Sequence, residues 1–296
     1  MPDVHLDPDK RHDFVYLFDC KDGNPNGDPD AGNLPRVDPE TMQGLVTDVA
    51  VKRKVRDYID AAHGEEDERK IFMQHRGVLY RQQKRAFDDL DYDADEDDRD
   101  KVDEARQWMC QNFYDVRAFG AVMSTSKYNC GQVRGPLQLT FARSVDPVVP
   151  MDLSITRVAV TREEDAEKKE TEMGRKALIP YGLYQGRGFY NPMLAEQTGF
   201  AGDDLSLFWK ALEMGWELDR SASRGMVALR GLLVFSHDNA LGNAPAHRLF
   251  DRIRFDEPRD DADPARSFDD YRERLSIDDT DLPDGVTLTR VVDPAV

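Results

Sequence analysis

A mixed α+β fold is what the sequence of 296 residues predicts. Short apolar runs typical of buried strands alternate with segments whose apolar residues recur at helical spacing, and one long charged segment interrupts the pattern. A chain of this length buries enough surface to fold without disulfides or a structural metal. Its three cysteines are widely spaced and form no CxxC pair, which disfavours a disulfide framework and a zinc site.

The first expected elements are a strand, a loop and a helix. Residues 13–20 (DFVYLFDC) are apolar and aromatic and predict a buried strand. Glycine and proline exclude regular structure from residues 22–39, and an ordered loop of this length usually has a function. In the helix predicted for residues 44–62, one face is apolar and a neighbouring face has three cations, Lys52, Arg53 and Arg56. The helix can therefore pack on a sheet and still present these cations.

A helical insertion is expected next. Residues 63–113 are charged, favour helix and have no strand pattern. From Asp115 onward, glycine-rich turns alternate with short apolar runs. Within that region Leu137, Leu139 and Phe141 are expected on one face of a strand.

The last elements complete the pattern. Residues 154–161 predict a strand, and the polar residues 161–172 predict a projecting tip. Residues 181–190 (YGLYQGRGFY) predict a strand whose glycines leave its backbone open to close approach. A core helix follows, with apolar residues at Leu205, Phe208, Trp209, Leu212 and Trp216, and a buried strand at residues 229–236 comes last. This order is that of a ferredoxin-like, or RNA-recognition-motif, sheet with large insertions.

The charge of the chain is concentrated in two segments. The formal charge of −18 argues at first against a nucleic-acid partner. However, residues 86–104 contribute −9 and residues 256–284 contribute −8, so the remaining residues are nearly neutral and can form local basic patches. Blocks of like charge are usually solvated and mobile. With no apolar run of membrane-spanning or signal-peptide length, the sequence predicts a soluble cytoplasmic protein with no membrane partner.

Patterns for metal binding and catalysis are weak. The first half of a calcium loop is present in Asp22, Asn24, Asn26 and Gly27. Asn33 occupies the position of the bidentate glutamate, and a strand precedes the loop where a helix is required, so calcium is disfavoured. Of six scattered histidines only His237 and His247 lie close together, without a visible nucleophile or further ligand. We therefore expect no metal, no cofactor and no catalytic residue.

Basic residues beside glycine form a more frequent pattern. Glycine lets a polyanion approach the backbone, and arginine can contact phosphate through two nitrogens or stack on a base. The loop at residues 22–39 can add backbone donors and the amides of Asn24 and Asn26, directed to a phosphate–sugar chain or to a neighbouring subunit. Single-stranded RNA binding is thus the leading hypothesis from the residues alone. The clusters are Lys52, Arg53 and Arg56; Gly131, Gln132, Arg134 and Gly135; Gly174, Arg175 and Lys176; Gly186, Arg187 and Gly188; and Arg220, Arg224 and Gly225.

Longer segments resemble one family. They include residues 24–41 (NPNGDPDAGNLPRVDPET), 112–125 (NFYDVRAFGAVMST), 129–148 (NCGQVRGPLQLTFARSVDPV), 180–184 (PYGLY) and 237–250 (HDNALGNAPAHRLF). Over about residues 14–250 the sequence resembles the backbone subunits of type I-C CRISPR Cascade complexes. These subunits belong to the repeat-associated mysterious protein superfamily.

The resemblance implies a non-catalytic protein that polymerises along CRISPR RNA. Copies of the chain would form a helical filament with other Cascade subunits and present the guide for base pairing with target DNA in antiviral defence. It also implies an RNA-recognition-motif palm (residues 13–62, 117–148 and 178–255), a helical finger insertion (63–116) and a β-hairpin thumb (149–177). An acidic C-terminal region (256–296) follows.

The resemblance also suggests which residues contact RNA. The basic helix face of Lys52, Arg53 and Arg56 matches the family's backbone-phosphate contact, and residues 119–124 match a loop near a displaced base. By analogy Met123 would wedge beside that base, with Ser124 next to it. The full set of expected RNA contacts is Asn24, Asn26, Lys52, Arg53, Arg56, Met123, Ser124, Gln132, Arg134, Arg175, Lys176, Arg187 and Arg220.

One alternative function is an endoribonuclease of the same superfamily. Such an enzyme would process the CRISPR RNA precursor with a histidine such as His237. The chemistry requires that histidine beside a loop facing the scissile phosphate, and no tyrosine or lysine partner is identifiable from the spacing.

Overall fold

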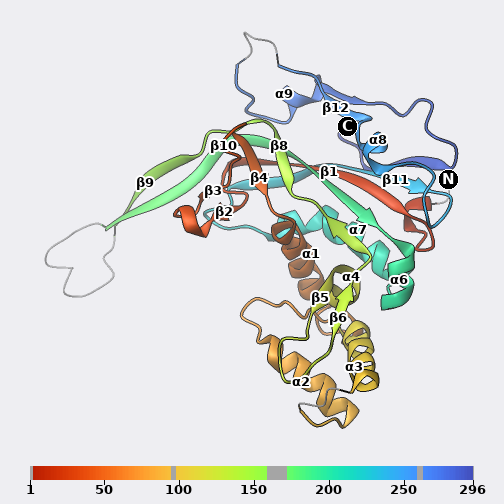
Figure 1. Ribbon diagram of the computed structural model, residues 1–296. Helices are drawn as coiled ribbons and strands as arrows, with labels where there is room; N and C mark the ends of the chain where they lie inside the picture. Colours follow the sequence, from red (N-terminus) through yellow and green to blue (C-terminus); the bar gives the residue numbers. More distant parts are fainter. Residues whose placement is uncertain (1–2, 95–97, 159–171, 259–262, 296) are drawn as a thin grey trace, which may run out of the picture.

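An antiparallel sheet organises the computed structural model, which describes residues 3–94, 98–158, 172–258 and 263–295 (Figure 1). Its longest strands are β1 (His12–Gly23), β10 (Glu172–Tyr190) and β11 (Met226–His237). The strand order is β14-β11-β1-β10-β8-β4, and β7 and β9 also pair with β10. The flanking strands are β4 (Gln43–Val46), β7 (Leu137–Leu139), β8 (Ala142–Pro147), β9 (Met151–Arg157) and β14 (Val286–Val292). The predicted α+β class is confirmed.

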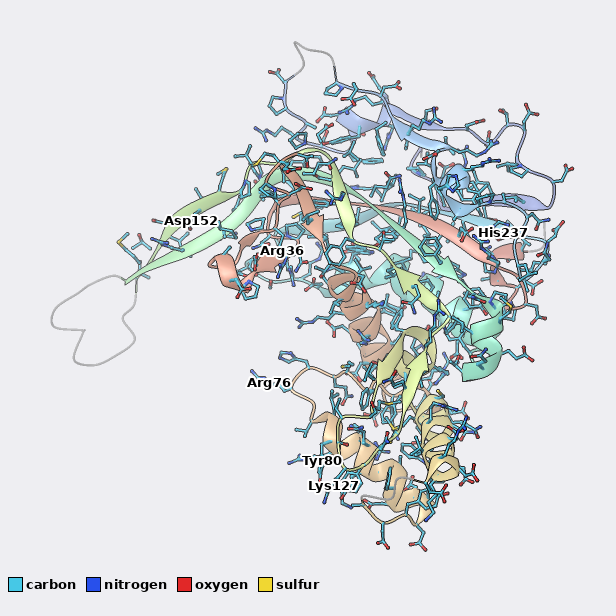
Figure 2. All side chains as sticks on the ribbon, in the orientation of Figure 1. Arg36, Arg76, Tyr80, Lys127, Asp152 and His237 are labelled. Carbon is cyan, nitrogen blue, oxygen red and sulfur yellow. The ribbon has the colours of Figure 1, made fainter. Side chains whose placement is uncertain are left out.

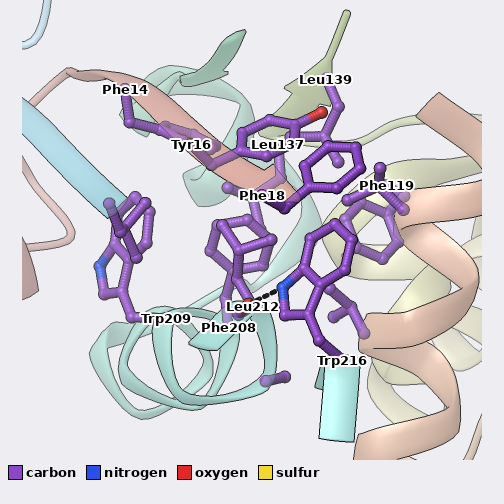
Figure 3. Close-up of a cluster of buried hydrophobic side chains, with 14 of the residues drawn as sticks. Phe14, Tyr16, Phe18, Phe119, Leu137, Leu139, Phe208, Trp209, Leu212 and Trp216 are labelled. Carbon is purple, nitrogen blue, oxygen red and sulfur yellow. Dashed lines mark hydrogen bonds between the residues drawn. The ribbon is translucent and has the colours of Figure 1, made fainter. Parts of the chain in front are cut away.

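Two long helices cover one face of this sheet. Helices α1 (Asp48–His63) and α7 (Gly202–Leu218) lie on the same side of β1 (Figure 1). Strand β1 points Phe14, Tyr16 and Phe18 toward them, and Figure 3 shows these rings packed with residues of α7. Trp216 stacks on Phe18 with ring centroids 4.4 Å apart. The predicted core helix is therefore confirmed. Helix α1 begins after β4, so the expected helix start at residue 44 was four residues early.

The other face of the sheet is covered by the C-terminal region. Val15 and Leu17 of β1 point there and pack with Phe268 and Tyr271. Because both faces of β1 are buried, its central residues Phe14–Phe18 form a continuous apolar run rather than an alternating pattern. This region contains α8 (Ala246–Phe250), β12 (Ile253–Phe255), α9 (Asp269–Arg272) and β13 (Leu275–Ile277), and β14 extends the main sheet. The expectation of a mobile acidic block at residues 256–284 is wrong for its described part, where apolar residues between the carboxylates anchor the segment.

A third hydrophobic cluster forms the core of a separate lobe below the sheet (Figure 1). It contains α2 (Leu79–Leu90), α3 (Arg99–Asn112) and the hairpin of β5 (Gly120–Val122) and β6 (Gln132–Arg134). We call residues 72–134, as far as they are described, the helical lobe. Short helix α4 (Tyr114–Phe119) joins this lobe to the helices under the sheet. The lobe core continues to Val133, beyond the expected end of the insertion at residue 116.

Strand β9 and the first residues of β10 form a projecting hairpin. They pair from Met151 with Leu178 to Arg157 with Glu172 and extend away from the sheet (Figure 1). Of the expected polar tip at residues 161–172, all but residue 172 lies outside the described residues. The connecting segments contain β2 (Gly27–Asp28), β3 (Leu34–Pro35), α6 (Pro192–Thr198) and the 3-10 helices η1 (Val4–Leu6), η2 (Pro29–Ala31) and η3 (Asp67–Arg69). Phe141 lies beyond the end of β7 and is 55% exposed, so it does not share the buried face of Leu137 and Leu139.

The glycines of β10 leave space for aromatic rings of the protein's own core rather than for a ligand. Gly186 pairs with Tyr16 and Gly188 with Phe14 across the β1–β10 ladder. A methyl group at Gly186 would lie 2.1 Å from Cζ of Tyr16, and one at Gly188 would lie 2.1 Å from Cζ of Phe14. The close approach predicted for this strand is thus made by the protein's own core.

Gly186→Ala is expected to lower the free energy of unfolding by about 1–3 kcal/mol, the usual cost of overpacking a closed core. Gly202→Ala is a suitable control, because its added methyl group would meet its nearest atom, in Pro8, at 3.6 Å. Urea unfolding of both variants measures the effect. Equal stability of the two variants would show that the Tyr16 ring can move aside.

Candidate nucleic-acid interface

The three cations predicted on α1 have different environments. Lys52 Nζ pairs with Asp48 at 3.0 Å, and Arg56 Nε pairs at 2.8 Å with the buried carboxylate of Asp115. The Lys52 and Arg56 side chains are each only 13% exposed. Arg53 instead extends from the helix with 56% of its side chain exposed and pairs loosely with Asp57 at 3.4 Å. Arg53 is therefore the cation that α1 presents, and the expected phosphate contact by Arg56 is replaced by a structural ion pair.

The glycine- and proline-rich loop is fixed from inside. Asn24 is buried, and its Nδ2 donates to the carbonyl of Asn33 at 2.7 Å. Asn26 Oδ1 accepts from the backbone N–H of Thr47 at 2.9 Å, just before α1 begins. The Asn24 amide is thus enclosed, contrary to the expected RNA contact, because it positions the loop. Arg36 on the same loop is partly exposed and pairs with Asp28 at 3.4 Å.

Arg53 and Asn26 are brought together near the start of α1. Both line a small cavity of about 200 Å³, with Thr47 and Asp57 also on its wall. Figure 2 shows Arg36 on the neighbouring loop, between the projecting hairpin, where Asp152 is labelled, and α1. We call the start of α1 with Arg53, the loop with Arg36, and the projecting hairpin the cationic side.

The projecting hairpin has two more cations, which are neighbours on β10 and therefore point to opposite faces of the hairpin. The Arg175 side chain is 82% exposed and contacts Asp152 at 3.4 Å. Lys176 is partly exposed and has no ion-pair partner among the described residues. Exposed guanidinium and ammonium groups of this kind can approach a phosphate backbone without first breaking a buried ion pair.

Met123 cannot act as the expected wedge. It is 1% exposed and belongs to the core of the helical lobe. Its carbonyl accepts from Gln83 Nε2 at 2.6 Å, and its backbone N–H donates to the carbonyl of Gly131 at 2.9 Å. Ser124, the next residue, is exposed. The prediction for Met123 is wrong because the β5–β6 hairpin folds its loop back onto the lobe.

The remaining expected contacts lie elsewhere on the molecule. Gln132 and Arg134 are exposed on β6 and line a polar cavity of about 530 Å³ between the lobe and α6. Arg187 is exposed on the face of the sheet opposite α1, where its guanidinium lies 5.4 Å from the ring centroid of Phe250. Arg220, after the end of α7, pairs with Glu217. Gln132, Arg134 and Arg187 are not gathered with Arg53, whereas Arg220 directly follows Asp219, which lines the same cavity as Arg53.

The comparison with protein families decides the identity of the chain. A model described as "CRISPR-associated protein Cas7" matches residues 10–277. The chain belongs to this Cas7 family. A Cas7 protein of Haloferax volcanii, named "CRISPR-associated protein Cas7", is 26% identical over 305 residues, which cover 96% of this chain and 84% of the relative.

Solved structures with some similarity also come from CRISPR systems. A chain of a "CRISPR RNA-guided surveillance complex, pre-nicking" has 20% identity and a TM-score of 0.48, covering 76% of this chain and 75% of its own. A chain of a "CRISPR RNA-guided surveillance complex" has 15% identity and a TM-score of 0.45, covering 84% and 71%. The CRISPR resemblance seen in the sequence is confirmed at the level of the Cas7 family.

The buried environment of His237 contradicts a nuclease role for this residue. His237 is fully buried, as is Asp13. Its Nδ1 accepts from the backbone N–H of Asn243 at 2.9 Å, so Nε2 has the proton and donates to Asp13 Oδ2 at 3.0 Å. Both ring nitrogens are therefore engaged inside the Cas7 fold, where no scissile phosphate can reach them.

A charged cluster around Lys54, which is not among the predicted site residues, holds the cationic side together. Lys54 is 5% exposed, pairs with Asp219 and lies 5.2 Å from the ring centroid of Trp216. Burial lowers the pKa of Lys54, and the Asp219 charge opposes that effect. Arg224 also pairs with Asp219 at 3.1 Å and donates to the carbonyls of Asn24 and Pro25 at 3.1 Å each. The cluster thereby links the loop at residues 22–39 to both α1 and α7.

The position of Lys54 in the sequence could have predicted that this lysine is paired. Three residues after Val51 and one before Val55, Lys54 falls beside the apolar face of α1. A lysine there must be paired, because an isolated buried charge is costly. Within the described parts of the chain, no three histidine, cysteine, aspartate or glutamate side chains lie close enough to hold a metal ion, and no helix there is long and apolar enough to cross a membrane.

Proposed function

We propose that this Cas7 family protein binds CRISPR RNA as the repeated backbone subunit of a type I-C Cascade surveillance complex. The observation that carries the proposal is the family match over residues 10–277. In this role the protein is not an enzyme. It works in the cytoplasm with copies of itself and other Cascade subunits, and it presents the guide for base pairing with target DNA.

The parts of the molecule have distinct roles in this proposal. The sheet with α1 and α7 is the RNA-recognition-motif palm, the helical lobe is the finger and the projecting hairpin is the thumb. The order β1-α1-β7/β8-β10-α7-β11, with β11, β1 and β10 adjacent, supports the palm assignment. The cationic side is where the RNA backbone lies.

The mechanism is physical rather than chemical. Arg53, Arg175 and Lys176 neutralise phosphates and release counterions. The Lys54–Asp219–Arg224 cluster keeps the loop beside them rigid, so little ordering entropy is lost when RNA binds. A guide that is already ordered on the protein pairs with DNA at a lower entropic cost, and its sequence supplies the specificity.

Replacing Arg53, Arg175 and Lys176 together by alanine tests this assignment. Each lost phosphate contact should reduce the slope of log affinity against log salt by about 0.7 for a single strand, so the triple variant should lose about 2 units of slope. Fluorescence anisotropy with a labelled CRISPR RNA at several salt concentrations measures the slope. Arg187→Ala, on the opposite face of the sheet, is the matched control and should leave it unchanged.

Two results would count against the proposal at different levels. An unchanged slope in the triple variant would remove these residues from the RNA interface. A wild-type protein that binds CRISPR RNA no better than an unrelated acidic protein would overturn the proposed function itself.

A further inference from the structure

Exposed apolar and basic side chains gather at one edge of the helical lobe. Residues 73–81, which we call the lobe edge, expose Met73 (44%), Val78 (48%), Leu79 (37%) and Tyr80 (41%). Arg76 lies among them with a positive φ of 60°. Arg76 and Arg81 are both exposed and have no ion-pair partner among the described residues. Contiguous exposed apolar residues of this kind mark an interaction surface.

The composition of the lobe edge favours a protein partner over a nucleic acid. Surfaces that bind single strands rely on aromatic rings and cations, whereas the lobe edge also exposes the aliphatic groups of Val78 and Leu79. Methionine, tyrosine and arginine are enriched in protein interfaces. Lys127 adds a further charge 5.9 Å from the ring centroid of Tyr80, and Figure 2 shows Arg76, Tyr80 and Lys127 on one side of the lobe. The partner should therefore be apolar and acidic.

A cleft with these properties exists at the opposite end of the same chain. It has a volume of about 1000 Å³ and lies between the base of the projecting hairpin and the C-terminal region. Val149, Met151 and Tyr181 form part of its apolar wall. Four carboxylates that have no ion-pair partner among the described residues line it as well, namely those of Asp256, Glu257, Asp263 and Glu273. Arg266 and Arg274 also line the cleft, and Arg274 pairs with Asp146 at 2.7 Å, so the cleft is acidic on balance. We call this the C-terminal cleft.

We propose that the lobe edge of one copy docks into the C-terminal cleft of the next copy. The basic, apolar segment meets an acidic, partly apolar cleft, so charge and hydrophobic surface are complementary. Figure 1 places the lobe and α9, which borders the cleft, at opposite ends of the molecule. A contact between two different surfaces at opposite ends repeats from copy to copy and builds an open array. The inference rests on the proposed function, to which it adds the protein–protein contact of the backbone.

Charge reversal in the two surfaces tests the contact. The lobe variant Arg76→Glu with Arg81→Glu places acidic groups against an acidic cleft, and the cleft variant Glu257→Lys with Glu273→Lys places basic groups against a basic edge. Each variant alone should self-associate at least about tenfold more weakly than the wild type, because like charges face each other. An equimolar mixture should regain wild-type association, since every contact in an alternating array is again between opposite charges. Sedimentation velocity of the RNA-loaded full chain measures the assemblies.

Further measurements separate the possible outcomes. Arg99→Glu, at the exposed start of α3, is the control within the lobe and should leave association unchanged. A mixture that associates no better than the separate variants overturns the proposal. So does a lobe variant that associates normally but binds a short RNA or DNA strand more weakly, because the edge would then be a nucleic-acid surface. Failure of the wild-type chain to bind CRISPR RNA concerns the proposed function instead, and the charge-swap result without RNA still decides this contact.

Discussion

Asp204→Asn is expected to lower the free energy of unfolding by about 3–5 kcal/mol, the usual cost of removing one partner from a buried ion pair. Asp204 binds Arg117 through both carboxylate oxygens, at 2.9 and 2.7 Å, and the two side chains are 9% and 7% exposed. The variant would leave the Arg117 guanidinium without its counter-charge inside the protein. The pair also joins α7 to α4, so its loss loosens the contact between the sheet and the helical lobe.

Chemical denaturation at neutral pH measures this effect. Asp203→Asn is the matched control, because Asp203 is the preceding residue on the same helix and is exposed. That control should change the free energy of unfolding by less than about 0.5 kcal/mol, as is usual for surface substitutions. If both variants lost the same stability, an effect on the first turn of α7 would explain the result better than the ion pair.

Protonation of His12 is expected to lower the free energy of unfolding by about 3 kcal/mol between pH 7 and pH 4. A tenfold difference in proton affinity between the folded and unfolded states corresponds to about 1.4 kcal/mol. Burial lowers the pKa of His12 from 6.5 to about 4. Because the folded-state pKa lies below the unfolded value, the unfolded chain takes up the proton first. The stability is therefore fully present above about pH 6.5 and is lost as the pH falls toward 4.

His12→Gln isolates this contribution from that of the carboxylates. Lys54 and Arg224 hold the pKa of Asp219 below its usual 3.8 against the opposing effect of burial, so the Asp219 contribution is lost at lower pH than that of His12. Free energies of unfolding at pH 7, 5.5 and 4.5 should converge for wild type and variant as the pH falls. A constant difference across this range would mean that His12 binds its proton equally well in both states.

Elements that bury a continuous apolar surface were predictable from the sequence. Strand β1 and helix α7 pack apolar side chains along their length, so the local pattern and the three-dimensional position agree. The packing of the C-terminal region on the sheet was not predicted, because the net charge of a segment gives no information about the few apolar side chains within it. Phe268 and Tyr271 are only 7% and 2% exposed among exposed carboxylates, and two buried rings are enough to fix such a segment on a sheet.

The candidate interface was predicted less well than the fold. Residue type and spacing indicate that a cation lies on a helix face, but a partner from a distant part of the chain decides whether that cation is free. Arg56 meets Asp115, 59 residues later, and Lys54 meets Asp219, 165 residues later. A local sequence pattern cannot show such pairs, because their partners are far apart along the chain. For the same reason the environment of Met123 depended on the fold of the whole β5–β6 loop.

The pairing of β1 also determines when this chain can fold during synthesis. Both neighbours of β1 come late, since His12 pairs with Tyr190 and with Ser236. The helical lobe, whose core lies within residues 72–133, can complete its local contacts much earlier. The apolar run of β1 therefore has no partner strand while more than half of the chain is synthesised, and during that time it is exposed to aggregation or to chaperone binding on the ribosome.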